Sequence, residues 1–159
     1  MNTAYLLIGG NLGDRAAYLQ TALKRIEETC GAISHYSSIY ETAAWGNTDQ
    51  PSFFNQAVVL STTLSPAALM DQLLAIELEM GRIRTQKYGP RTIDLDILMI
   101  DKLVVDSEKL TIPHPQMHNR RFALLPLAQI APTLYHPIMG LTVAELLDTC
   151  PDTLDVQKK

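Results

Sequence analysis

The sequence is poor in cysteine, which argues against two classes of protein. It has two cysteines in 159 residues, Cys30 and Cys150, with no CxxC pair and no cluster of cysteine with histidine. A disulfide framework and a cysteine-ligated zinc site are therefore not expected. We expect two unpaired thiols in a reducing compartment.

Long hydrophobic runs and an excess of basic residues are also missing. No apolar stretch approaches the roughly 20 residues that a membrane-spanning helix needs. The apolar run at 4–8 has no basic segment before it, unlike a secretory signal peptide. The net charge of −4 does not suit binding to long nucleic acids. We expect a soluble, cytoplasmic protein that binds small molecules and neither membrane nor nucleic acid.

What is present is an ordinary globular composition. Apolar residues make up 47% of the chain and charged residues 19%. A chain of 159 residues fits one domain that buries its own core. We therefore predict a single domain over 1–159, and we expect a monomer because no large apolar stripe indicates a dimer interface.

Hydrophobic periodicity predicts four strands and two helices in the first hundred residues. A helical pattern follows Asp14 and ends near Gly31, and a second follows the capping Ser65 and the first-turn Pro66 and ends near Gly81. Strands are predicted at 4–8, 32–42, 53–63 and 93–100. The order βαββαβ predicts an α+β fold with a ferredoxin-like antiparallel sheet and helices packed on it.

The last third of the chain is predicted to be a C-terminal extension of this fold. We expect a hairpin at 101–112 and short helices near 121–130 and 142–148. The final residues, 157–159, are expected to be frayed.

Two acidic residues interrupt the last predicted strand. Residues 89–100 read GPRTIDLDILMI, so Asp94 and Asp96 lie two positions apart in an apolar run. Such side chains share one face of a strand, and the two carboxylates repel each other unless something compensates. Mg²⁺ would do so, because it takes carboxylate oxygens and usually completes its shell with water and substrate phosphates. The alternative is a solvated strand end without a metal.

Four basic residues precede this acidic pair: Arg82, Arg84, Lys87 and Arg91. Arginine binds phosphate oxygens through two parallel hydrogen bonds, so the segment suits a polyphosphate held beside a metal ion. It can equally be a solvated basic loop. The sequence contains neither GxxxxGK[ST] nor GxGxxG, so a nucleotide would be bound by side chains rather than by a glycine-rich loop.

A second polar cluster, TIPHPQMHNRRF, covers residues 111–122. Pro115 stands between His114 and His118, which disfavours a helical pair of metal-binding histidines. For His114, a hydrogen bond to a ligand or to phosphate is one possibility, and an ordinary structural role is the other.

A third cluster combines aromatic side chains with an amide and a hydroxyl. Trp45 and Phe53 could stack on a flat heteroaromatic ligand while Thr42 and Asn55 bind its edge. Core packing would explain the aromatic residues equally well. A buried amide such as that of Asn55 needs hydrogen-bond partners, which favours the ligand.

Together these motifs resemble the 6-hydroxymethyl-7,8-dihydropterin pyrophosphokinase family of folate biosynthesis. The stretch KYGPRTIDLDILM is similar to its signature, and LIGGNLGD is similar to its N-terminal opening. Further matching positions are Tyr40, Thr42, Gly46, Asn55, Ala57, Glu77, Gly81, Arg82, Arg84, Leu110, Pro113, His114, Asn119, Arg120 and Phe122.

The resemblance implies a reaction and a role for each matched residue. The family transfers diphosphate from ATP to the pterin hydroxymethyl group and releases AMP, with two Mg²⁺ ions on a ferredoxin-like fold. By matched position, Asp94 and Asp96 would hold both metal ions. Arg82 and Arg91 would bind the phosphates. These four residues would be the catalytic residues. ATP would also contact Arg84, Ile97, Thr111, His114 and Arg120. The pterin would contact Thr42, Ala43, Trp45, Phe53, Asn55 and Phe122.

Two other hypotheses fit part of the sequence. A ligand-binding or regulatory module of the same fold would bind nucleotide without forming AMP, but it leaves the acidic pair unexplained. A Mg²⁺-dependent nuclease or nucleotidyltransferase would also use paired aspartates, although the acidic net charge disfavours long nucleic acids.

Overall fold

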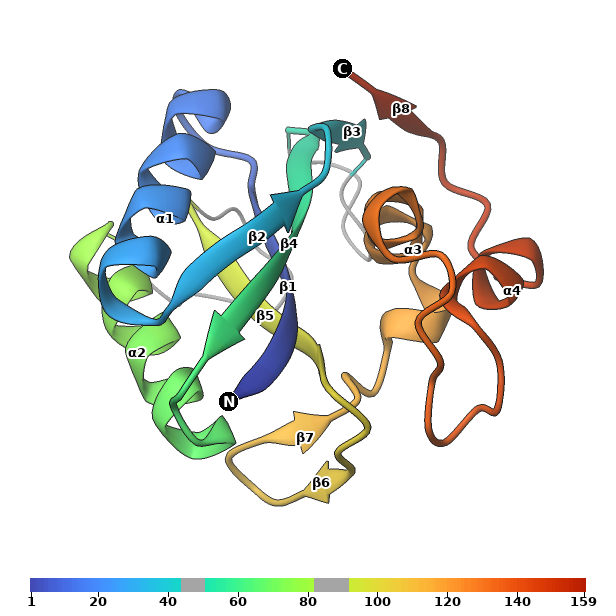
Figure 1. The fold of residues 1–159 in the computed structure, drawn as a ribbon. Coiled ribbons are helices and arrows are strands. Elements are labelled where there is room, and N and C mark those ends of the chain that lie inside the picture. Colours follow the sequence, from blue (N-terminus) through green and yellow to red (C-terminus); the bar gives the residue numbers. More distant parts are fainter. Residues whose placement is uncertain (44–50, 82–91) are drawn as a thin grey trace.

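The computed structural model describes residues 1–43, 51–81 and 92–159, and its centre is one antiparallel β-sheet (Figure 1). The strands follow the spatial order β5-β1-β4-β3-β8, and β2 also pairs with β4. This sheet contains β1 (Asn2–Gly10), β2 (Ala32–Tyr36), β3 (Tyr40–Thr42), β4 (Phe53–Thr62), β5 (Asp94–Ile100) and β8 (Val156–Lys158). The predicted α+β class with an antiparallel sheet is confirmed.

Helices cover both faces of the sheet, so the molecule has three layers (Figure 1). One face carries α1 (Arg15–Thr29) and α2 (Pro66–Glu79), and the other carries α3 (Arg121–Ile130) and α4 (Val143–Asp148). The remaining elements are the short hairpin β6 (Val105–Asp106) and β7 (Thr111–Ile112), and the 3₁₀ turn η1 (Met117–Asn119). Within the described parts of the chain, each helix is too short or too polar to cross a bilayer.

The first two helices begin where their capping residues predict. The Asp14 carboxylate accepts a hydrogen bond from the Ala17 N–H at 3.1 Å, and the Ser65 hydroxyl oxygen accepts one from the Ala68 N–H at 3.2 Å. The predicted apolar stripes face the sheet, and their fully buried members are Leu19, Ala22, Ile26, Leu69, Leu73 and Ile76. Both cysteines are unpaired, as expected.

The predicted strand at 32–42 is instead two strands, β2 and β3. Ser37 lies between them, where its hydroxyl oxygen accepts a hydrogen bond from the Ala57 N–H at 2.9 Å and its own N–H donates to the Ala57 carbonyl at 2.9 Å. A side chain therefore takes the place of a backbone acceptor and interrupts the ladder. The sequence periodicity does not reveal this break because the residues on both sides favour strand.

The prediction of a frayed C-terminal tail is wrong. Residues 156–158 form β8, which pairs with β3 through Val156 opposite Thr42, and Val156 is 8% exposed. The preceding carbonyl of Asp155 accepts a hydrogen bond from the Thr42 hydroxyl at 3.0 Å. Pairing with a strand more than a hundred residues earlier orders the tail, and no local pattern signals such pairing.

Candidate active site

A pocket opens on the α3 face of the sheet, at one end of the central strands. The free space in and above it, open solvent included, is about 560 Å³. Its walls are formed by Leu7, Gly9, Thr42, Ala43, Phe53, Asn55, Asp94, Asp96, Arg120 and Phe122. All but the first two were predicted as site residues, so the fold joins into one pocket several groups that are far apart in sequence.

Asp94 and Asp96 lie on the pocket wall, on the same face of β5 as strand alternation predicts. Both are partly exposed, whereas Leu95 and Ile97 between and after them are 4% and 2% exposed and pack in the core under α1 and α2. The wall thus presents two carboxylates to a space that is open to solvent, and carboxylate oxygens are the donors that Mg²⁺ requires. Among the described residues, no group of three or more acidic, histidine or cysteine side chains could hold a metal. A metal ion here would therefore depend on further ligands, as Mg²⁺ bound to substrate phosphates does.

A buried carboxylate fixes the backbone between these two aspartates. Glu77 on α2 is 3% exposed, and its Oε2 accepts a hydrogen bond from the Leu95 N–H at 2.7 Å. The bond ties the second helix to β5 at the residue that separates Asp94 from Asp96. Glu77 matched the family pattern, but the sequence analysis gave it no role.

The opposite side of the pocket carries a buried amide whose nitrogen has no hydrogen-bond partner in the described parts of the chain. Asn55 on β4 is 5% exposed, and its Nδ2 has no partner among the residues that the structure describes. A buried N–H donor left unpaired costs free energy, so a ligand acceptor in the pocket would relieve that cost. The Thr42 hydroxyl already donates to the Asp155 carbonyl at 3.0 Å.

Gly9, which the sequence analysis did not select, allows this arrangement. A Cβ at Gly9 would collide with the Asn55 Oδ1 and would lie 2.8 Å from the Phe54 carbonyl oxygen. The glycine therefore lets Asn55 pack against β1 at the pocket wall. The available signal was the LIGGNLGD motif, whose similarity to the family's N-terminal opening did not point to Gly9 itself. Leu7 was missed because it looks like any core leucine.

His114 lies beside the pocket and is neutral near physiological pH. Burial and the positive charge of Arg120 lower its pKa to about 4, against the opposing effect of Asp94. Its Nδ1 accepts a hydrogen bond from the Gln116 backbone N–H at 3.1 Å, and the His114 backbone N–H donates to the Leu98 carbonyl at 2.9 Å. A neutral imidazole that accepts at Nδ1 carries its proton on Nε2, so His114 can donate one hydrogen bond to an anionic ligand.

Besides His114, two predicted ATP contacts, Ile97 and Thr111, are not part of the pocket wall that the described residues form. The Ile97 side chain is 2% exposed and packs in the core, so only its backbone is available to a ligand. Thr111 begins β7, three residues before His114. Trp45, Arg82, Arg84 and Arg91 lie outside the described residues.

The fold and the pocket define an α+β protein with a pocket lined by paired carboxylates, a cation and aromatic rings. The family model for 7,8-dihydro-6-hydroxymethylpterin-pyrophosphokinase (HPPK) matches residues 5–132. The chain belongs to this family.

Curated relatives agree with this family. The chain is 43% identical over 148 residues to a 2-amino-4-hydroxy-6-hydroxymethyldihydropteridine pyrophosphokinase of Methylorubrum extorquens, and the match covers 92% of each chain. It is 43% identical over 130 residues to a Bacillus subtilis protein of the same name, covering 81% of this chain and 78% of that one. It is 42% identical to the folic acid synthesis protein fol1 of Schizosaccharomyces pombe, covering 93% of this chain and 20% of that one.

Solved structures show the same fold. Plasmodium falciparum HPPK-DHPS, crystallised with pteroate, superposes with a TM-score of 0.77 at 19% identity over 93% of this chain. A second HPPK-DHPS structure, in complex with substrates, gives a TM-score of 0.75 at 19% identity over 93% of this chain. The chain spans less than half the length of these solved proteins, 42% and 43% respectively.

Proposed function

We propose that the pocket is the active site of a diphosphate transfer from ATP to the hydroxymethyl group of 6-hydroxymethyl-7,8-dihydropterin, a step of folate biosynthesis. The products are AMP and the pterin diphosphate. Family membership and the names of relatives at 43% identity support this reaction. The observation that carries the proposal is that Asp94, Asp96, Asn55 and Phe122 line one pocket.

The pterin occupies the side of the pocket formed by β3, β4 and the start of α3. Phe122 covers one face of the ring, with Phe53 or Trp45 on the other, since aromatic rings favour stacking on flat ligands. The Asn55 amide, whose Nδ2 lacks a protein partner within the described chain, binds the polar edge of the pterin. Thr42 and Ala43 contact that edge through their backbone, because the Thr42 hydroxyl is engaged by Asp155.

ATP lies toward β5, the segment 111–120 and the basic residues before β5. Asp94 and Asp96 would hold two Mg²⁺ ions, and the chemistry these ions would supply is neutralisation of phosphate charge and a lower pKa for the substrate hydroxyl. Arg82 and Arg91 bind the phosphates and stabilise the charge that develops on them. The remaining ATP contacts are Arg84, the Ile97 backbone, Thr111, His114 and Arg120.

The protein's part in this reaction is mainly noncovalent. The pterin hydroxyl oxygen forms a bond to the β-phosphorus and loses its proton, while the bond from the β-phosphorus to the oxygen shared with the α-phosphate breaks. AMP leaves with that oxygen. The side chains of this pocket act by orienting the hydroxyl toward the phosphorus and by matching the phosphate charge, which accounts for most catalysis in phosphoryl transfer.

The strand order also supports a finer description of the fold. Without β3 and β8, the order β5-β1-β4-β2 with antiparallel pairing is the arrangement of a ferredoxin-like sheet. We infer that the chain is a single catalytic domain over 1–159 that acts on small molecules as a cytoplasmic monomer.

A nucleotide-product assay tests the function. The protein is mixed with ATP, Mg²⁺ and 6-hydroxymethyl-7,8-dihydropterin, and AMP is separated from ADP. We expect AMP only when the pterin is present, and no AMP after a chelator until Mg²⁺ is restored. Asp96→Ala should lower turnover by at least about 100-fold, because charge stabilisation at the phosphates is lost. Asp106→Ala, which removes an exposed carboxylate from β6, is the matched control.

Other products point to other functions. ADP in place of AMP would mean transfer of a single phosphoryl group and would overturn the proposal. ATP binding without turnover would support the ligand-binding module. Near-normal turnover of Asp96→Ala would remove the role given to the acidic pair.

A further inference from the structure

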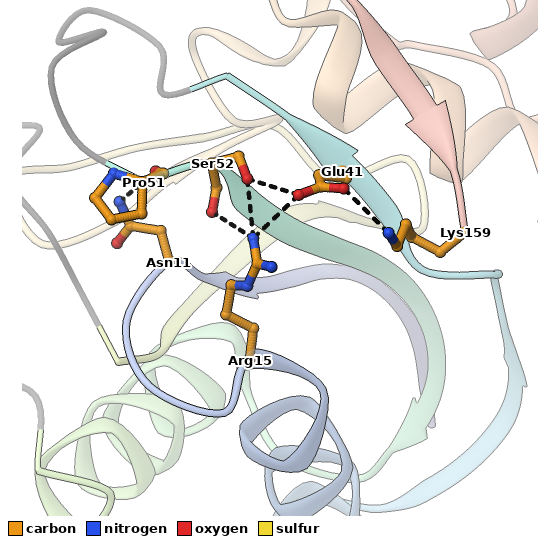
Figure 2. Close-up of polar contacts among 6 residues, drawn as sticks. All are labelled: Asn11, Arg15, Glu41, Pro51, Ser52 and Lys159. Atoms are coloured by element: carbon orange, nitrogen blue, oxygen red, sulfur yellow. Dashed lines mark hydrogen bonds and ion pairs between the residues drawn. The ribbon is translucent and has the colours of Figure 1, made fainter.

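A polar network lies on the side of β3 and β4 that faces away from the pocket. Arg15, the first residue of α1, donates from one guanidinium nitrogen to the Glu41 Oε2 at 3.2 Å, to the Ser52 carbonyl at 3.0 Å and to the Ser52 hydroxyl at 2.9 Å (Figure 2). The Ser52 hydroxyl in turn donates to the Glu41 Oε2 at 2.7 Å. One arginine therefore joins the last part of β3 to the residue just before β4.

Two further contacts complete the network. Lys159 binds the second carboxylate oxygen of Glu41, with its Nζ 3.2 Å from Oε1 (Figure 2). The Arg15 guanidinium also lies over the Phe54 ring, 3.9 Å from its centroid. Hydrogen bonds from Ser52, Lys159 and Arg15 hold the pKa of Glu41 below its ordinary value, so the carboxylate is charged at neutral pH.

The network residues and the pocket residues are neighbours in the chain. Thr42 follows Glu41, Phe53 follows Ser52, and Thr42 and Phe53 pair directly across the two strands. Because successive side chains of a strand point to opposite faces, Glu41 faces the network while Thr42 and Phe53 face the pocket. A shift of Glu41 or Ser52 therefore moves a pocket residue on the other side of the same backbone.

The same segment is held at one more point. Asn11 is 2% exposed, and its Nδ2 donates to the Pro51 carbonyl at 2.9 Å (Figure 2). Asn11 in the loop after β1 and Arg15 at the start of α1 thus bind two consecutive residues, Pro51 and Ser52.

We propose that Arg15 and Glu41 are positioning residues for the pterin end of the pocket, and that they set the placement of Thr42 and Phe53 without touching the substrate. This inference rests on the proposed function. The side chains of Arg15 and Glu41 are 27% and 30% exposed, and ion pairs exposed to solvent add little to global stability. Several hydrogen bonds from one planar guanidinium fix a geometry more than they stabilise a fold. The network therefore acts mainly on substrate affinity.

Steady-state kinetics of Arg15→Met test the proposal, because methionine keeps an apolar stem over Phe54 but removes every donor. We expect the KM for the pterin to rise about tenfold, since displacement of positioning groups by even 1 Å has effects of this order or larger. The KM for ATP and kcat should stay within about threefold of wild type. Arg15→Lys keeps the positive charge but loses the planar guanidinium with its several donors. This variant and Glu41→Gln should also raise the KM for the pterin while the KM for ATP and kcat change little.

Arg25→Met is the matched control. Arg25 also lies on α1 and bridges to another element, with its guanidinium 2.9 Å from the Glu79 carboxylate, at 48% exposure and away from the pocket. Its kinetics should equal those of wild type. If Arg15→Met leaves the pterin KM unchanged, or raises both KM values together with a fall in unfolding temperature, the positioning role is wrong.

A binding measurement separates this inference from the proposed function. The dissociation constant of the pterin is measured by titration with a non-hydrolysable ATP analogue and Mg²⁺ present. Wild type that binds pterin but forms no AMP would overturn the proposed function. In that case a tenfold weaker pterin affinity of Arg15→Met would still support the positioning role, and an unchanged affinity would contradict it.

Discussion

The two faces of the sheet use the same strands for different purposes. Toward α1 and α2, the strands present a continuous apolar surface that includes Leu6, Ile8, Val58, Leu60, Leu95 and Ile97. Toward α3 and α4, the same strands contribute a smaller core of Leu7, Ala57, Leu98 and Met99. That second face also carries the pocket with its carboxylates and its buried amide.

The difference shows how one fold supports both stability and chemistry. Burial of apolar side chains supplies most of the driving force for folding, and the face under α1 and α2 supplies much of it. The other face can then place Asp94 and Asp96 side by side and bury Asn55 without a protein partner for its Nδ2 in the described chain. Such groups cost stability locally, and they are typical of functional sites.

The largest effect on stability is expected on the α1 and α2 face. Leu73 on α2 is fully buried, so Leu73→Ala should lower the free energy of unfolding by about 2–5 kcal/mol. Turnover measured at a temperature where the variant is folded should stay close to wild type. The comparison uses urea denaturation and the AMP assay, with Leu78→Ala as control, because Leu78 lies on the same helix at 73% exposure. A large loss of turnover at full folding would show that the two faces are not independent.

On the pocket face, we expect a large effect on substrate binding and a small effect on stability. Asn55→Ala should raise the KM for the pterin by at least about 100-fold, because the hydrogen bonds to the edge of the pterin are lost. Stability should change by less than about 1 kcal/mol, since the substitution also removes a buried donor without a described partner.

The neighbouring residue on the same strand provides the control. Gln56 is also 5% exposed, but its Nε2 donates to the Ser37 carbonyl at 2.7 Å. Gln56→Ala should reduce stability and leave pterin affinity unchanged. If Asn55→Ala and Gln56→Ala lose the same stability and the same pterin affinity, the two faces of β4 do not differ in the way proposed.

The smallest effect is a pH dependence on the α3 and α4 side. Burial, and to a lesser extent the neighbouring His118, lower the pKa of His136, whose Nδ1 accepts hydrogen bonds from the Ile138 and Met139 N–H groups. Since its folded pKa is below its unfolded one, the unfolded state takes up the proton first as pH falls. The stability that neutral His136 contributes is therefore present above about pH 6.5 and is lost on acidification.

Urea denaturation at pH 7, 6 and 5 measures this effect. We expect a steeper loss of unfolding free energy for wild type than for His136→Asn, which keeps an acceptor but does not titrate. His35→Asn, at an exposed position on β2, should follow wild type. Parallel curves for wild type and His136→Asn would contradict the assignment. His114, whose pKa is also lowered, is unchanged in these variants and cancels in the comparison.

Much of the fold could be predicted because its signals are local. The caps at Asp14 and Ser65 and the alternation in β5 depend on residues within a few positions of each other. The pairing of the tail with β3 could not be predicted, because it joins segments more than a hundred residues apart. The break at Ser37 was missed for a related reason, since it depends on a hydrogen bond to the distant Ala57.

In the site too, local patterns could be predicted and contacts between distant segments could not. Residue chemistry and the family motifs identified eight of the ten residues that line the pocket. Gly9 was missed because its role is the close approach of Asn55, a contact between two strands rather than a property of either. Arg15 was missed because its three acceptors come from Glu41 and Ser52, which have no special pattern around them.

The sequence by itself determined which side chains are candidates for the chemistry and on which side of each strand they lie, because side-chain alternation and capping act over a few residues. The tertiary structure decided which of those residues share a pocket and what holds them there. The ion pair between Glu41 and Lys159 spans 118 positions of the chain. Contacts at such separation form only when strand pairing and core packing bring the segments together, so the network behind the pterin end exists only in the folded molecule.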